Sequence, residues 1–300
     1  MNFAYLSCPI ESYLNKDAAL DTVVSALDSG HLSILLGSGV SHSADDSFPS
    51  WTSLVERICK QSSVTFDNNK ANDNSYLLKR AEKVKTQAPN EYLDYVEQAL
   101  YKDVAYNNSV LKKDLLIAIG SLIMISVSRN SKEFVNFNFD DLFEWYLEYY
   151  GNDIQIVSNP ITLLGNTTST IYHPHGFLPK EKKFINFKTK KILFSQNDYD
   201  VAMRLHSPWS TVLQRLFSSK LILMVGMSGE DAHFRTTCNF VYNDILEKKR
   251  PLGFLILPDN EESREDEDVN LQNGIVNLYL DLEKLPEIIL EICRKAQKIN

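Results

Sequence analysis

Short runs of consecutive apolar residues recur along the chain, separated by longer and more polar segments. Such runs are typical of strands buried on both faces of a sheet, because half-exposed strands alternate apolar and polar residues instead. The runs predict strands over residues 32–36, 134–137, 170–172, 221–225, 252–257 and 276–280. We expect these strands to form the interior of the protein.

A different period prevails between about residues 52 and 130, where no strand pattern is visible. Apolar residues there recur every three or four positions, which predicts helices over 76–86, 92–101 and 111–127. Pro49-Ser50-Trp51 leads into an earlier helix, and a last one is expected over 281–298. Because short apolar strands are separated by helices, the pattern predicts an α/β fold with a parallel sheet covered on both faces.

Composition and charge narrow the classes of protein. Of the 300 residues, 44% are hydrophobic and 23% charged, as in a globular protein with one large α/β domain or two smaller ones. The net charge of −8 disfavours nonspecific binding to nucleic acid or an anionic membrane. The apolar run 115–127 is shorter than the roughly 20 residues of a membrane span. We therefore expect no direct nucleic-acid binding and no membrane association. The acidic run 259–268 is interpreted as a solvated surface loop.

The cysteines indicate neither a metal site nor a disulfide framework. Cys8, Cys59, Cys238 and Cys293 stand far apart, with no pair at zinc-ligand spacing. Residues 1–10 lack the basic start of a secretory signal, so we expect a cytoplasmic protein.

A glycine-containing segment, Gly37-Ser38-Gly39-Val40-Ser41, follows the first predicted strand. Glycines at this place allow backbone amides to approach a pyrophosphate, and the start of the next helix favours negative charge. The dinucleotide-binding fingerprint is incomplete, because His42 stands where its third glycine would be. Taken alone, the segment fits a tight structural turn as well as a phosphate-binding loop.

Polar side chains also follow the strand predicted at 134–137. Asn138, Asp140 and Asp141 enter the loop there, where strands of open α/β sheets place ligand contacts. Asn and Asp are also common helix caps, so an aspartate could instead begin a helix over 142–150.

Two further strand ends carry candidate chemistry. His175 lies in His173-Pro174-His175-Gly176, where an imidazole can be structural or can exchange protons near neutral pH. Gly226-x-Ser228-x-x-Asp231 follows the most apolar strand and is interpreted as a ligand-binding loop.

Taken in order, these four segments resemble the sirtuin-like family, specifically the bacterial NAD-hydrolysing branch used in defence against phage. The resemblance spans His31 to Arg235, about two thirds of the chain. It implies a Rossmann-like, NAD-binding sheet in a single sirtuin-like domain over 1–300. A helical insertion would occupy approximately 52–130, and residues 131–300 would complete the core and add a terminal helix.

Departures from the deacylase branch point away from acyl-lysine substrates. The four-cysteine zinc module of sirtuin deacylases is absent, and Ser38 stands where the family usually has alanine. Phe48-Pro49-Ser50-Trp51 replaces the Pro-Asp-Phe-Arg run of deacylases. We therefore expect hydrolysis of NAD, as substrate, to nicotinamide and ADP-ribose, with no metal.

The resemblance also implies roles for individual residues. Asn138 would hold the nicotinamide ribose or the attacking water, and His175 would be the general base. Asp140 would shape the loop or contact a ribose. The residues implied to bind the diphosphate are Gly37, Ser38, Gly39 and Ser41, and those implied at the far nucleotide end are Gly226, Ser228 and Asp231, with Ser228 and Asp231 near the adenosine half.

Such an enzyme would be the toxic effector of an abortive-infection system that depletes NAD when triggered, and it would need restraint. No sensor domain is recognisable after Asp281, so we expect a regulatory partner protein encoded nearby, or assembly into a homo- or hetero-oligomer. The alternative is a non-catalytic nucleotide-sensing or scaffold module that binds NAD or ADP-ribose. Joint presence of Asn138 and His175 favours catalysis over that alternative, and protein deacylation is a third possibility.

Overall fold

The computed structural model describes residues 10–162, 169–202, 204, 207–229 and 231–298. Residues 1–9, which include Cys8 and most of the segment tested above for a secretory signal, lie outside these ranges. Cys59, Cys238 and Cys293 lie inside them, and each is a buried free thiol.

The predicted α/β fold is confirmed, because one parallel sheet runs through the described part of the chain. Seven strands pair in the order β3-β4-β2-β1-β5-β6-β7, and every pairing is parallel. The strands are β1 (Leu32–Leu36), β2 (Glu133–Asn136), β3 (Ile154–Val157), β4 (Ser169–Tyr172), β5 (Leu221–Val225), β6 (Gly253–Pro258) and β7 (Ile275–Leu280).

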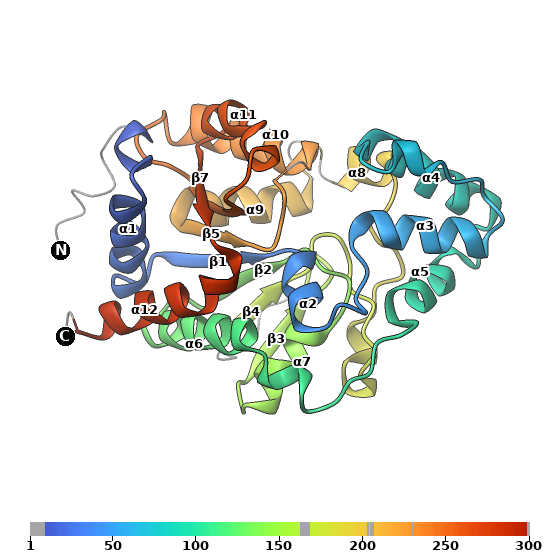
Figure 1. The fold of residues 1–300 in the computed structure, drawn as a ribbon, viewed down its shortest axis with the longest axis horizontal. Helices are drawn as coiled ribbons and strands as arrows, with labels where there is room; N and C mark the ends of the chain where they lie inside the picture. The colour runs from blue at the N-terminus through green and yellow to red at the C-terminus, as the bar shows by residue number, and fades with distance from the viewer. Residues whose placement is uncertain (1–9, 163–168, 203, 205–206, 230, 299–300) are drawn as a thin grey trace.

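Helices cover both faces of the sheet (Figure 1). One face packs against α1 (Lys16–Asp28), α6 (Asp114–Ser128), α7 (Leu142–Tyr149) and α12 (Leu285–Lys298). The other packs against α9 (Pro208–Ser219) and α10 (Ala232–Phe240). Successive strand residues point to opposite faces, so Ile34 contributes to the first core and Leu35 to the second. This two-sided burial explains why the strands are apolar without alternation.

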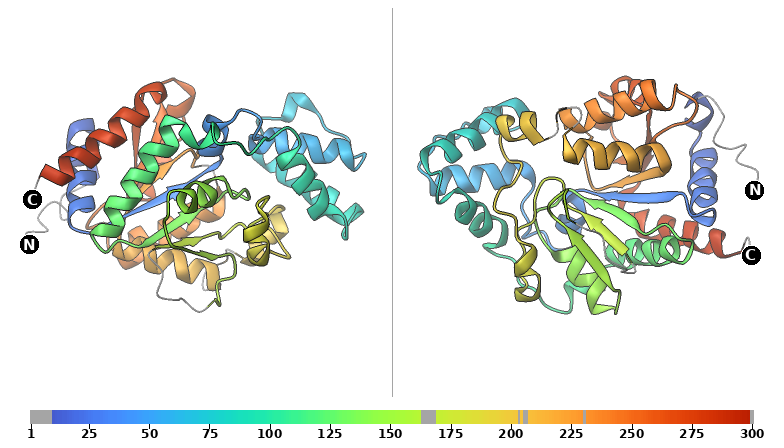
Figure 2. Two further views of the ribbon diagram at one scale, coloured as in Figure 1. Left: turned by 90° about the horizontal axis from the view of Figure 1, so that it is seen from below. Right: turned by 180° about the vertical axis from the view of Figure 1, so that it is seen from behind.

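A group of helices lies beyond the carboxyl ends of the strands (Figure 2). It contains α3 (Trp51–Gln61), α4 (Asn74–Gln87) and α5 (Tyr92–Tyr101), which share a separate apolar core. A short helix, α8 (Gln196–Ala202), joins α4 through an ion pair between Lys85 and Asp198. By contrast, α6 packs on the sheet and on α12. The helical stretch between β1 and β2 therefore contributes to two different cores.

The predicted strands agree with the structure to within a residue or two at each end. The helices α1, α8, α9 and α10 were not foreseen, and neither was the four-residue edge strand β3, in which Gln155 interrupts the apolar run. The predicted last helix begins at Leu285, after a 3-10 turn over Leu282–Lys284. The acidic run contains a 3-10 turn, Glu262–Arg264, and the start of α11 (Glu267–Gln272), so it is more ordered than the predicted loop. None of the helices in the described ranges has both the length and the apolar character needed to cross a membrane.

The order of the strands determines where a ligand can bind. From β1 the chain builds one half of the sheet through β2, β3 and β4, and then crosses to β5, which pairs with the other side of β1. In open α/β sheets, ligands bind outside the carboxyl ends of the strands at such a switch point. The four polar segments identified from the sequence all follow strands at this edge.

Candidate functional site

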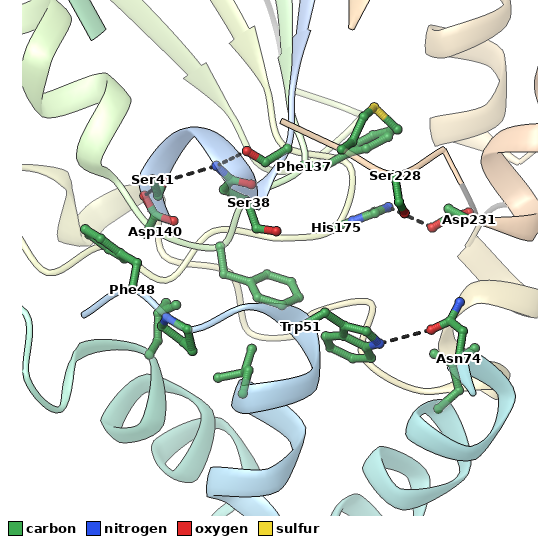
Figure 3. A pocket seen from close by; sticks show the side chains of 18 of the residues that line it. Ser38, Ser41, Phe48, Trp51, Asn74, Phe137, Asp140, His175, Ser228 and Asp231 are labelled. Carbon is green, nitrogen blue, oxygen red and sulfur yellow. Dashed lines mark hydrogen bonds and ion pairs between the residues drawn. The ribbon is translucent and has the colours of Figure 1, made fainter. Parts of the chain in front are cut away.

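A cavity of about 240 Å³ opens at the switch point between the sheet and the helices α3, α4 and α5. The ends of β1, β2, β4 and β5 form its polar side, and Figure 3 shows Ser41, Asp140, His175 and Asp231 around it. From the helical side it is lined by Phe48, Pro49, Trp51, Leu54, Asn74, Leu78, Leu100, Gln196 and Tyr199. We call this the first cavity. It has a polar wall facing an apolar and aromatic one, as ligand sites commonly do.

Asn138 and His175, predicted on separate loops, both line the first cavity. Asn138 is 6% exposed, and its Nδ2 donates to the carbonyl oxygen of Gly37 at 3.1 Å and to Oγ of Ser41 at 3.2 Å. A carbonyl oxygen can accept but not donate, so these contacts fix which way the amide is turned. Its Oδ1 makes no hydrogen bond within the described ranges and is the side-chain atom left for a ligand.

Ser41 connects Asn138 to Asp140. Its hydroxyl donates to Oδ1 of Asp140 at 2.9 Å, and the backbone N–H of Leu142 donates to the same oxygen at 3.2 Å. The pKa of Asp140 is raised to about 7, mainly by burial and to a smaller extent by the charge of Glu144, while the Ser41 hydrogen bond opposes the rise. Asp140 therefore exchanges its proton near neutral pH, and its loop is tied to the segment after β1.

Aromatic side chains pack against His175. Its ring is stacked on Phe137, with centroids 4.2 Å apart and planes 9° apart, and it meets Tyr199 edge-on at 5.2 Å. Its Nε2 lies 3.6 Å from Oδ2 of Asp231. Gly176, at a φ of +107°, follows directly, and a Cβ there would lie 2.8 Å from a methyl group of Ile192. The glycine lets the loop pass close to Ile192 while His175 faces the cavity.

A buried polar network beneath this loop was not foreseen from the sequence. His173 and Glu144 are both fully buried, with Nε2 of His173 3.1 Å from Oε1 of Glu144. Nδ2 of Asn136 donates to the same Oε1, and Nδ1 of His173 lies 3.3 Å from the carbonyl oxygen of Asn138. The network ties α7 and β4 to the backbone of Asn138. The sequence feature that could have indicated this network is the pair of histidines in His173-Pro174-His175, because one can face the cavity while the other lies below it.

The glycines after β1 and β5 pack against each other. The amide of Gly37 donates to the carbonyl of Val225 at 2.9 Å, and the amide of Gly39 donates to that of Gly226 at 2.8 Å. A Cβ on Gly37 would lie 2.5 Å from the Gly226 oxygen. These two amides bond within the protein, so they are not presented to a diphosphate in this structure. The hydroxyls of Ser38 and Ser41 are the polar side-chain groups of this segment that line the first cavity.

A second cavity, of about 440 Å³, lies on the far side of these glycines beside β6. Met227 and Ser228 line both cavities, so the two are adjacent. Gly39 and Gly226, predicted to contact the ligand, line the second cavity and not the first, whereas Asp231 lines the first and not the second. Other polar residues around the second cavity are Ser43, Asn260, Ser263, Asp266 and Asn270.

Asp141, the second aspartate of the loop, does not line the first cavity. Its Oδ1 accepts hydrogen bonds from the hydroxyls of Tyr101 and Tyr106, at 3.1 and 2.6 Å, and its Oδ2 accepts one from the amide of Glu181 at 2.8 Å. Its pKa is raised by burial, which these hydrogen bonds partly oppose. Asp141 thus holds α5 and the connection after it against the start of α7.

Comparison with known proteins bears on part of the chain. No curated protein matches it, whereas the model of one domain family does. The match covers residues 132–277, which include Asn138, His175, Ser228 and Asp231 but not the segment after β1. Residues 132–277 match the model of the SIR2-like domain family.

Proposed function

We propose that this chain is an NAD glycohydrolase that cleaves NAD to nicotinamide and ADP-ribose. The observation that supports this most directly is the convergence of Asn138 and His175, from the loops after β2 and β4, on the first cavity. The SIR2-like domain supports the use of NAD.

Asn138 would orient the reacting groups. Because its Nδ2 is occupied by Gly37 and Ser41, its Oδ1 is the atom that can accept a hydrogen bond from water or a ribose hydroxyl. Nicotinamide is a good leaving group when its ring nitrogen is cationic, so the reaction needs little acid catalysis. Holding water and ribose in line supplies much of the rate enhancement of such a reaction.

His175 would take the proton of that water. As the water oxygen bonds to C1 of the ribose, the glycosidic bond breaks and its electron pair goes to the nicotinamide nitrogen. The water proton passes to the imidazole, which is a suitable base near neutral pH. The aromatic wall around Phe48 and Trp51 would exclude competing water from the leaving group.

The adjacency of the two cavities supports a placement for the rest of NAD. We propose that the nicotinamide riboside half lies in the first cavity and the adenosine half in the second, with the diphosphate passing Met227 and Ser228. Ser38 and Ser41 would contact the diphosphate or the ribose beside it through their hydroxyls. Gly37, Gly39 and Gly226 would serve by allowing the two strand ends to approach closely.

The test is nicotinamide release from NAD by the purified chain, measured alone and together with the products of neighbouring genes. Asn138→Ala and His175→Ala should each lower the rate at least about 100-fold, because each removes a group used in the transition state. Both variants should keep the circular dichroism spectrum of the parent. Asn152→Ala and His31→Ala, which lie outside both cavities, serve as controls and should leave the rate unchanged.

Full activity in either cavity variant would contradict the assignment. NAD binding without nicotinamide release under every condition would favour the nucleotide-sensing module, and acetyl-lysine turnover would favour a deacylase.

We further propose that the activity is restrained until a trigger arrives, as expected for an anti-phage effector that acts by depleting NAD. Unregulated hydrolysis would drain the NAD of its own cell, so a partner protein or assembly into an oligomer would have to control it. The same assay addresses this: full turnover by the chain alone would contradict the need for a partner.

A further inference from the structure

Asp231 lies beside the imidazole of His175, at the reacting end of the proposed NAD site and not at its adenosine end. Its Oδ2 is 3.6 Å from Nε2 of His175 (Figure 3). It lines the first cavity together with His175. If the adenosine half lies in the second cavity, as proposed above, a contact to that half does not account for the position of Asp231, which does not line that cavity.

The two oxygens of this carboxylate have separate environments. Asp231 is the N-cap of α10, and its Oδ1 accepts a hydrogen bond from the amide of Phe234 at 2.8 Å. The cap fixes the orientation of the carboxylate, and Oδ2 is the oxygen nearest His175. The helix thus holds a negative charge at a constant place beside the ring.

The aromatic contacts of His175 do not determine which of its two ring nitrogens carries the proton. Stacking on Phe137 and the edge contact with Tyr199 fix the plane of the ring, but neither contact favours a proton on one nitrogen over the other. The carboxylate does, because it attracts a proton to Nε2, which is a buried atom. In a neutral imidazole with its proton on Nε2, Nδ1 carries the lone pair.

We propose that Asp231 is a positioning residue for His175: its carboxylate holds the proton on Nε2, and Nδ1 is then the atom that accepts the proton of the attacking water. This rests on the proposed cleavage of NAD. When the water proton reaches Nδ1, the ring becomes an imidazolium with a proton on each nitrogen. The adjacent carboxylate then balances the positive charge that has formed.

Other titratable groups around His175 must be separated from this effect. Tyr199 of α8 meets the ring edge-on, and Asp140 lines the same cavity from the loop after β2. Burial raises the pKa of Asp140 to about 7, so it titrates in the range where activity would be measured. The experiment is therefore carried out in the parent chain and repeated in an Asp140→Asn background.

The first measurement is the pH dependence of nicotinamide release by Asp231→Asn. The amide keeps an oxygen that can cap α10, so the variant removes the charge and retains the cap. We expect kcat to fall about 10- to 100-fold with little change in KM, because the base and not the binding of NAD is affected. The acid limb of the profile should move to lower pH, since the carboxylate no longer favours the protonated ring. Asp67→Asn, at the cap of an exposed turn, is the matched control and should change neither quantity.

The second measurement does not need activity. Nitrogen-15 NMR of the imidazoles in the full-length protein reports which ring nitrogen carries the proton, and His175→Gln identifies the signal of His175. We expect the Nε2-protonated form in the parent and loss of that preference in Asp231→Asn. The same protonation pattern in both proteins, or a rise in KM at constant kcat, would overturn the proposal. If no preparation cleaves NAD, the proposed function fails, while the NMR result still decides the role of Asp231.

Discussion

Two polar residues of the first cavity, Asn138 and Asp231, are each held by the protein through one side-chain atom and leave another for chemistry. Nδ2 of Asn138 is bound by Gly37 and Ser41, which leaves Oδ1. Oδ1 of Asp231 caps a helix, which leaves Oδ2 near His175. Side chains fixed in this way lose little entropy when a substrate binds, so their orientation is settled before the reaction.

Asp140 should make the stability of the protein depend on pH. Burial raises its pKa from 3.8 to about 7, so the unfolded chain releases this proton first as the pH rises. The contribution of Asp140 to the free energy of unfolding is therefore fully present below pH 3.8 and is lost as the pH rises through about 7. The loss is on the order of 2–4 kcal/mol. Asp140→Asn, which keeps an oxygen acceptor for Ser41, should be more stable than the parent at pH 8 by about that amount, as urea unfolding between pH 4 and pH 8 can measure. Asp67→Asn should follow the parent curve, and a pH dependence equal to the parent's in Asp140→Asn would refute this prediction.

At the scale of elements, the helices α3, α4 and α5 share an apolar core that also includes Phe139, Leu178, Ile192 and Phe194. Their position over the first cavity therefore depends on contacts with the segments that follow β2 and β4. Asp141 supplies a central one, because it accepts hydrogen bonds from Tyr101 at the end of α5 and from Tyr106 just after it. The ring of Tyr106 is also stacked on Trp145 of α7, at 4.8 Å. The apolar wall of the cavity is held over the strand ends in this way.

Removing the hydroxyl of Tyr106 should loosen this attachment. Tyr106→Phe keeps the stacked ring but deletes a 2.6 Å hydrogen bond to a buried carboxylate, which should cost about 1–3 kcal/mol in unfolding free energy. Hydrogen exchange should also become faster in α3, α4 and α5 than in the strands. Tyr95→Phe, within α5, is the control, because no hydrogen bond of its hydroxyl is seen within the described ranges. Equal stability of the two variants would show that Asp141 does not need this donor.

At the scale of the molecule, the positions of the strands can be predicted from the sequence better than the contacts between residues that are distant in the sequence. Strand 221–225 was predicted at its observed bounds because a strand buried on both faces has to be apolar throughout. β3 was missed because an edge strand of four residues with a polar position carries little signal. The proximity of Asp231 to His175 was also missed. It depends on the order of strands in the sheet, where β5 lies beside β1 and not beside β4, and on the position at which α10 begins. Neither can be predicted from the local sequence pattern.

The two halves of the sheet meet where β1 and β5 end, and Gly226 lies at this junction. Its φ is +74°, and a Cβ there would lie 2.6 Å from the amide nitrogen of Val40. Gly151 has a similar φ of +80° with nothing within 4 Å of the added atom. Gly151→Ala therefore measures the backbone strain alone, about 1–2 kcal/mol. Gly226→Ala adds a clash that must push the segment after β1 away from β5, at a further cost of about 1–3 kcal/mol.

Because Gly37 and Ser41 bind the side-chain amide of Asn138, that displacement should also move this amide out of place. Gly226→Ala should therefore lose most NAD cleavage even at temperatures below its lowered melting temperature, where it is still folded. Gly151→Ala should lose stability but keep its turnover at the same temperature. Thermal unfolding and nicotinamide release measured on the same samples separate the two effects. Equal losses of stability and equal turnover in the two variants would mean that the close approach of the strand ends does not position Asn138.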